Sequence, residues 1–149
     1  MKQILLVEDN PGDARLAEEL LNECSDFDVH VTCVGSVSDA RSALSKQAID
    51  LIFLDLALPD SKGLEGLRRL TSMSLNAPII VLSGSEDKSL ALEALKHGAQ
   101  DYLIKGTMNA AALSRIIGYS IERKAAEVRH LSLAAKKSRP SAWKPQEAR

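Results

Sequence analysis

The sequence predicts an α/β fold in which helices cover both faces of a parallel β-sheet. Short apolar runs of strand length alternate with longer segments whose apolar residues recur at helical spacing, and this alternation occurs five times. The run at 51–54 contains only apolar residues, which is typical of a central strand buried on both faces. An acid, Asp55, follows this run directly, so it is expected at the carboxyl edge of the sheet.

The first half of the chain predicts strand, helix, strand, helix and strand. Residues 28–34 alternate between apolar and polar side chains, which indicates a half-exposed strand at an edge of the sheet. Ser36 or Ser38 is placed to cap the helix that follows. The expected elements are a strand over 3–7, a helix from the turn at 10–13 to about 24, a strand over 28–34, a helix with apolar residues from 40 to 48, and a strand over 51–55.

The second half continues the same alternation. Gly98 is expected to end a helix as its C-terminal cap, and Ser85 is expected to begin that helix. The expected elements are a weaker helix over 63–73, a strand over 79–82, a helix with apolar residues from 90 to 95, a strand over 102–104, and a last, extended helix from 108 or 109.

Right-handed βαβ connections join these strands into a doubly wound parallel sheet. The expected strand order is 2-1-3-4-5, the flavodoxin-like arrangement, in which the carboxyl ends of strands 1, 3, 4 and 5 lie close together. Those ends carry Glu8 and Asp9, then Asp55, Ser83 and Lys105.

This combination of charges suggests phosphoryl chemistry. Three carboxylates in one cleft repel one another, so a cation must compensate them. Lys105 supplies one charge, and Mg²⁺, which prefers oxygen ligands and binds phosphate oxygens, supplies more. An Asp carboxylate can attack phosphorus to form an aspartyl phosphate, a reaction that mainly requires positioning and charge neutralisation. We therefore interpret Asp55 as a phosphoryl acceptor, with the Ser83 hydroxyl donating to a phosphoryl oxygen.

Residues 3–124 resemble the receiver domains of two-component response regulators, of which the chemotaxis response regulator is the simplest. No single motif is specific to this family. The motifs are specific when they occur together, in this order and at the ends of strands. The motifs are Glu8-Asp9 after the first strand, Asp55 with Pro59 and Gly63 after the third, Ser83 after the fourth, and Lys105 after the fifth with Tyr102 three residues before it.

The resemblance implies a set of metal ligands and a phosphoryl donor. Glu8 and Asp9 would bind Mg²⁺, with Asp9 and Asp55 as direct ligands and the carbonyl of Ala57 as a backbone ligand. Asp55 would receive its phosphoryl group from a sensor histidine kinase or a histidine phosphotransfer protein. The chain would thus be a phosphoacceptor switch, and not an enzyme that acts on other substrates.

The resemblance also implies a switch built from Ser83 and Tyr102. The Ser83 hydroxyl would move toward the phosphoryl group, and Tyr102 would fill the space it leaves. The surface formed by the fourth helix, the fifth strand and the fifth helix would change shape for a downstream protein. Such a change biases an equilibrium that exists before phosphorylation.

Two departures from the family pattern concern the loops. Gly106 follows Lys105 where the family has proline with a cis peptide bond. A cis bond before a residue other than proline costs about 3–4 kcal/mol, so we expect a trans bond and a reshaped loop. Ala57 and Ser85, which stand where the family tunes the lifetime of the phosphoryl group, are both small.

Two other functions use similar parts. A phosphatase of the haloacid dehalogenase type also has an Asp nucleophile after a buried strand, but it needs a second Asp where this chain has Ala57. A flavin-binding electron carrier of the same fold needs a glycine- and hydroxyl-rich phosphate loop, whereas residues 8–10 are Glu-Asp-Asn. Both are less consistent with the sequence than the receiver.

The composition excludes several other classes. A net charge of -1 predicts no direct binding of nucleic acid. Cys24 and Cys33 lack metal-site spacing and are expected to be free thiols. The N-terminal apolar run is too short for a signal peptide or a membrane span, so we expect a cytoplasmic protein without membrane contact.

We expect the chain to divide into three regions: a receiver over 1–124, a helical extension over 125–135, and a disordered basic tail over 136–149. Apolar residues continue along the last helix at nearly heptad spacing, with Lys124 as an interruption. The second half of this helix is either solvated or a signalling helix that pairs with a second copy. Since no helix-turn-helix or second catalytic domain is visible, the chain is a stand-alone receiver or the receiver of a larger regulator.

Overall fold

The computed structural model describes residues 1–149 except 25, 74, 85–87 and 142–149. It contains a five-stranded sheet in the order β2-β1-β3-β4-β5, and every neighbouring pair is parallel, as predicted. The strands are β1 (Lys2–Val7), β2 (Val29–Val34), β3 (Leu51–Asp55), β4 (Ile79–Ser83) and β5 (Asp101–Ile104). The α-helices are α1 (Pro11–Asn22), α2 (Val37–Lys46), α3 (Glu65–Thr71), α4 (Lys88–Lys96) and α5 (Ala110–Ser141), and a 3₁₀ turn spans Lys105–Thr107.

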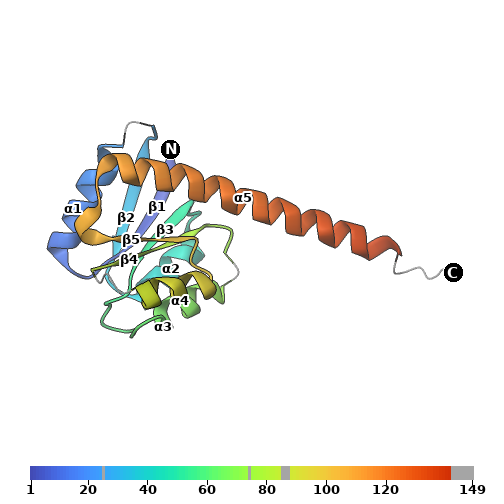
Figure 1. Ribbon diagram of the computed structural model, residues 1–149, viewed down its shortest axis with the longest axis horizontal. Helices are drawn as coiled ribbons and strands as arrows, with labels where there is room; N and C mark the ends of the chain where they lie inside the picture. The colour runs from blue at the N-terminus through green and yellow to red at the C-terminus, as the bar shows by residue number, and fades with distance from the viewer. Residues whose placement is uncertain (25, 74, 85–87, 142–149) are drawn as a thin grey trace.

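Helices cover both faces of the sheet, with α1 and α5 on one side and α2, α3 and α4 on the other (Figure 1). Alternate residues of each central strand face opposite layers. Ile52 and Leu54 of β3 pack toward α2, α3 and α4, whereas Leu51 and Phe53 pack toward α1 and α5. Because both faces are covered, the whole of β3 is buried, including its terminal residue Asp55.

Three helices begin at side chains that accept a backbone hydrogen bond. The Asn10 side chain accepts from the Asp13 N–H at 3.0 Å, Ser36 from Asp39 at 3.0 Å, and Asn109 from Ala112 at 2.8 Å. Of the two serines suggested by the sequence, Ser36 is therefore the cap. The expected cap at Ser85 lies outside the described residues.

Gly98 ends the turn after α4, as predicted. Its φ of 106° lies in the left-handed region that glycine adopts without strain. Its N–H donates to the Leu95 carbonyl at 3.3 Å, and the Ala99 N–H donates to the Ala94 carbonyl at 3.0 Å. These two bonds form a Schellman motif, which satisfies carbonyls that the helix end leaves unpaired.

Two helices differ from their expected bounds. The helix after β3 was predicted from residue 63, but Gly63 has a φ of 54°, so α3 starts only at Glu65. The last helix runs to Ser141, past the boundary at 135 where a disordered tail was expected to begin. Residues 142–149 lie outside the described part of the chain. The division of the chain at 124 and 135 stays a prediction.

Asp60 ties the loop after β3 to the start of α2. Its two carboxylate oxygens accept hydrogen bonds from the N–H groups of Val37 and Ser38, both at 3.0 Å. Arg69 of α3 donates to the Asp60 carbonyl at 3.1 Å. Partial burial acts to raise the pKa of Asp60, but the two backbone bonds outweigh it and hold that pKa below its usual value. The loop that follows Asp55 is thereby fixed to a neighbouring helix.

We expect Asp60→Ala to lower the free energy of unfolding by about 1–2 kcal/mol, because two N–H groups at the start of α2 lose their acceptor. Asp39→Ala, which removes an exposed acid from the same helix turn, should cost less. Since folding lowers the pKa of Asp60, its contribution is present above the unfolded-state pKa and is lost as pH falls through the folded-state pKa. Urea unfolding at neutral and acidic pH measures both effects. Equal losses for the two variants would contradict this role for Asp60.

Candidate functional site

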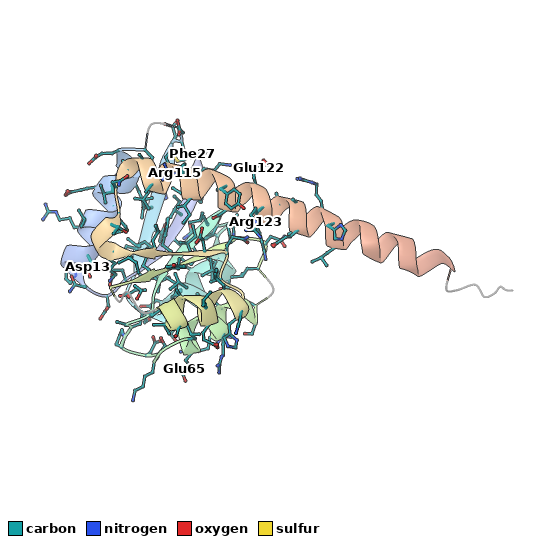
Figure 2. All side chains as sticks on the ribbon, viewed as in Figure 1. Asp13, Phe27, Glu65, Arg115, Glu122 and Arg123 are labelled. Atoms are coloured by element: carbon teal, nitrogen blue, oxygen red, sulfur yellow. The ribbon has the colours of Figure 1, made fainter. Side chains whose placement is uncertain are left out.

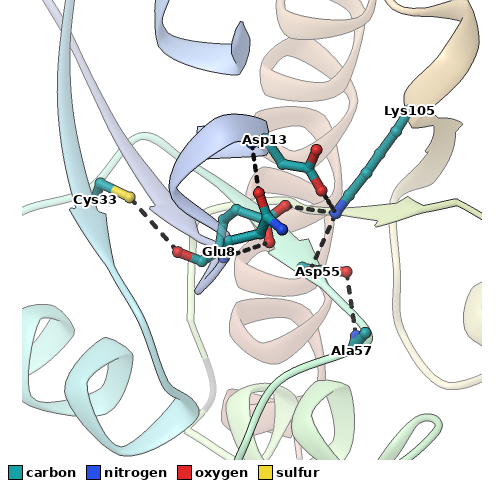
Figure 3. A network of polar contacts seen from close by, with 7 residues as sticks. Glu8, Asp13, Cys33, Asp55, Ala57 and Lys105 are labelled. Carbon is teal, nitrogen blue, oxygen red and sulfur yellow. Dashed lines mark hydrogen bonds and ion pairs between the residues drawn. The ribbon is translucent and has the colours of Figure 1, made fainter. Parts of the chain in front are cut away.

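Four charged side chains meet where β1, β3 and β5 end (Figure 3). The ammonium nitrogen Nζ of Lys105 lies 2.6 Å from Glu8 Oε1, 2.9 Å from Asp13 Oδ2 and 3.2 Å from Asp55 Oδ2. An ammonium group has three N–H donors, so these three carboxylates use its full capacity.

The register of the sheet brings these residues together. Val7 of β1 pairs with Leu54 of β3, so Glu8 and Asp55 leave adjacent strands at the same level. The Glu8 N–H also donates to the Val34 carbonyl at 2.9 Å, which continues the pairing with β2 past the end of β1. Lys105 follows β5 directly and extends past β4 to reach both acids.

Asp55 is 4% exposed and is held at both of its oxygens. Oδ2 faces Lys105, and Oδ1 accepts a hydrogen bond from the Ala57 N–H at 3.1 Å. Glu8 is 3% exposed, and its second oxygen accepts from the Asn10 N–H at 3.3 Å. These bonds fix the orientation of both carboxylates before any ligand is bound.

The electrostatics of the site follow from two buried acids beside one cation. Burial raises the pKa of Glu8 to about 7, and the neighbouring Asp55 adds to this rise, whereas Lys105 opposes it. Burial would lower the pKa of Lys105, but its bonds to Glu8 and Asp13 and the charge of Asp55 raise it above the usual value. Lys105 therefore stays charged, while Glu8 titrates near neutral pH.

Glu8, Asp9 and Asp55 form a group that could hold a metal ion. Each offers a carboxylate oxygen, and the three oxygens lie within 4.8 Å of one another. Asp9 is exposed, so the group opens to solvent on one side. Oxygen ligands in this number and spacing suit Mg²⁺, which keeps several of its waters. The three acids grouped by sequence reasoning thus come together, whereas the role of the Ala57 carbonyl as a ligand stays a prediction.

Ser83 and Tyr102, the predicted switch residues, share one small cavity. Leu56, Val81 and Ile104 also line it, together with residues of α4. Ser83 is the last residue of β4 and is half-buried, and Tyr102 packs against the apolar cluster on the α2, α3 and α4 side of the sheet. Tyr102 also borders a groove formed with α5.

Sequence reasoning missed Asp13 as part of the site. The sequence places it only in the turn at 10–13 where a helix begins, and it does lie in the first turn of α1. Its carboxylate also contacts Lys105, which lies 92 residues further along the chain. One signal was available: Asp13 lies in the first turn of a helix that starts at the carboxyl edge of the sheet.

The peptide bond at Lys105–Gly106 and the two cysteines agree with the sequence predictions. The described residues contain no cis peptide bond, so Lys105–Gly106 is trans, and this loop forms the 3₁₀ turn. Cys24 and Cys33 are free, and burial raises the pKa of both thiols. Over the described ranges, the chain has no helix long and apolar enough to cross a bilayer.

Comparison with known proteins agrees with this geometry. Residues 4–117 match the model of the response regulator receiver domain family. The regulatory protein LuxO of Vibrio cholerae is 36% identical over 100 residues, which cover 67% of this chain and 21% of that protein. The cell cycle transcriptional regulator CtrA of Caulobacter vibrioides is 33% identical over 114 residues, which cover 76% of this chain and 48% of CtrA. The chain therefore spans less than half the length of these two relatives.

A solved structure of similar fold contains the metal that the acidic group suggests. It is the receiver domain of sensor histidine kinase PA1611 from Pseudomonas aeruginosa PAO1, described with a magnesium ion coordinated in the active site cleft. It is 30% identical, with a TM-score of 0.69, and the match covers 81% of this chain and 98% of that one. With the family match over 4–117, the sheet order and the acidic site, the chain belongs to the response regulator receiver domain family.

Proposed function

We propose that Asp55 accepts a phosphoryl group from a phosphohistidine on a sensor histidine kinase or a histidine phosphotransfer protein. A carboxylate oxygen of Asp55 forms the new bond to phosphorus, the bond from phosphorus to the donor imidazole breaks, and the imidazole leaves. The observation that carries this proposal is the environment of Asp55. It is a buried carboxylate at a strand end, bound by Lys105 and by the Ala57 N–H, and next to two further acids.

The residues around Asp55 suit a bound Mg²⁺ ion. Asp9 and Asp55 would be direct ligands, with Glu8 and the Ala57 carbonyl completing the protein's share. Mg²⁺ would neutralise charge on the phosphoryl oxygens. Lys105 does the same from the protein side, since its ammonium is already directed at Asp55. The acids repel one another in the free chain, and their combined negative charge would attract a divalent cation.

Ser83 and Tyr102 would transmit the state of Asp55. They border the same small cavity, so a movement of the Ser83 hydroxyl toward Asp55 leaves room that the Tyr102 ring can fill. Because Tyr102 also borders the groove along α5, its movement would alter the surface formed by α4, β5 and α5. That surface would bind an unidentified downstream protein.

We infer the cellular setting from the same role. The chain would transfer a phosphoryl group only to its own Asp55, and the aspartyl phosphate would later be hydrolysed. It would therefore act on no separate substrate. A phosphoryl donor of this kind favours the cytoplasm as the site of action, and we infer that neither nucleic acid nor membrane is a direct partner. Its longer relatives favour a receiver that is part of a larger regulator over one that acts alone.

We also propose that the projecting part of α5 pairs with a second copy of the chain. Leu113 and Ile117 are buried against the sheet, and Lys124 still borders pockets of the receiver body. Beyond that point the helix leaves the body (Figure 1), and Leu131 is 68% exposed. The part of α5 beyond Lys124, residues 125–141, corresponds to about 26 Å of helix, which is left for a partner helix. This supports a receiver over 1–124 followed by a separate helical extension.

The phosphorylation site is tested by incubation with acetyl phosphate and Mg²⁺, followed by intact mass measurement. The wild-type chain should gain the mass of one phosphoryl group, and Asp55→Asn should gain none because the amide is a poor nucleophile. Asp60→Asn, an acid in the same loop, should be labelled like wild type. A full-level adduct on Asp55→Asn would rule out Asp55 as the acceptor.

The raised pKa of Glu8 predicts how stability depends on pH. Folding raises this pKa from 4.5 to about 7. Between these values the folded chain holds a proton that the unfolded chain has released, so stability falls as pH rises through this range and levels off above it. In the presence of a chelator, the melting temperature of Glu8→Gln minus that of wild type should therefore grow from about pH 4.5 to about pH 7. Glu122→Gln, at an exposed acid of α5 (Figure 2), should show no such trend. A constant difference for Glu8→Gln would contradict the shift.

Pairing through α5 is tested by sedimentation of the full chain with and without beryllofluoride, a phosphoryl mimic. Val128→Asp combined with Leu131→Asp should abolish a dimer, since both residues lie on the stripe that continues from Ile117. Ala126→Asp combined with His130→Asp adds the same charge to the opposite side of the helix and should have little effect. A full chain that is monomeric in every condition would refute the proposal.

A further inference from the structure

We propose that Asp13 is a positioning residue that holds the Lys105 ammonium over the phosphorylation site. This inference rests on the proposed function and deepens it. The observation is the contact of 2.9 Å between Asp13 Oδ2 and Lys105 Nζ, which joins the first turn of α1 to the end of β5. Figure 3 shows Lys105 between Asp13, Glu8 and Asp55.

Lys105 needs such a partner because of its place in the sheet. It leaves β5, and its ammonium must pass β4 before it reaches Asp55 at the end of β3. A lysine side chain has four rotatable bonds and about 2 kcal/mol of rotamer entropy, so it does not hold one extended geometry alone. A second fixed acceptor beside the ammonium, such as Asp13, restricts that freedom.

Of the three carboxylates around Lys105, only Asp13 remains unused by the chemistry. Glu8 and Asp55 belong to the group that could hold the metal ion, and Asp13 does not. Once Asp55 carries a phosphoryl group as an acyl phosphate, its carboxyl group also loses the negative charge that attracted Lys105. The N–H that faced Asp55 then becomes available to a phosphoryl oxygen, while Asp13 keeps the opposite side of the ammonium in place.

Asp13 is itself fixed well enough for this task. Its N–H is bound by the Asn10 side chain at 3.0 Å, and α1 is anchored on the sheet by Ala14, Ala17 and Leu21. Its side chain is 46% exposed, against 19% for that of Lys105, so the pair is partly solvated. A partly exposed pair contributes modestly to stability, and its main effect is on the geometry of Lys105.

The test is the affinity of the full chain for beryllofluoride in the presence of Mg²⁺, measured by isothermal titration calorimetry. Asp13→Ala should weaken this binding roughly threefold to tenfold. Asp13→Asn should keep most of it, because the amide oxygen still accepts a bond from Nζ. Lys105→Ala should weaken binding further, and Asp13→Ala added to Lys105→Ala should have no additional effect, since nothing remains to be positioned.

The matched control is Asp39→Ala, which removes an acid from the equivalent turn of α2 and should bind beryllofluoride like wild type. Urea unfolding confirms that each variant folds. If Asp13→Ala binds as tightly as wild type or more tightly, or if its loss persists without Lys105, Asp13 does not position the lysine. If wild type itself binds no beryllofluoride, the proposed function fails, and this inference fails with it.

Discussion

The Lys105 side chain extends from the end of β5 past β4, and its ammonium group contacts three carboxylates. Glu8 follows β1, Asp55 ends β3, and Asp13 lies at the start of α1. Without this cation, Glu8 and Asp55 would be two buried acids side by side, at a cost that burial makes large. Burial first, and then the neighbouring Asp55, raise the pKa of Glu8, although Lys105 opposes this rise. Three carboxylates therefore surround one ammonium group, and a divalent ion at the acidic group would supply further positive charge.

The sheet makes this arrangement possible because it is parallel and covered on both faces. Apolar residues along β3 fill both layers, so the only place for Asp55 is the end of the strand. The same rule places Glu8 after β1, whose last four residues are buried, and Lys105 follows the half-buried edge strand β5. The packing of the whole core thus holds the acids together. The free energy gained by burying the apolar layers beneath them offsets their mutual repulsion.

Sequence patterns predicted those features that depend on strand order and on local caps. Strand β3 has its predicted bounds, the order of the sheet is as expected, and Gly98 ends α4 because only its backbone makes that turn without strain. Contacts between distant elements were not predictable in this way. Asp60 accepts hydrogen bonds at the start of α2, 23 residues before it in the chain. Asp13 meets Lys105 only because α1 has a particular rotation on the sheet. No periodicity in the sequence encodes that rotation.

Tyr102 lies between the charged site and the long last helix, and it borders a hollow on each side. It lies between a small cavity shared with Ser83 and a groove shared with Ile116 and Tyr119 of α5. Complete conversion of a two-state equilibrium from 1:99 to 99:1 requires about 5.5 kcal/mol of differential interaction. Under the proposed function, a doubly charged phosphoryl group bound by Lys105 would act at one end of this path, and the packing of α5 would respond at the other. Since Leu113 and Ile117 are buried in the core, such a response would be accommodated more easily beyond Lys124, where the helix has left the body.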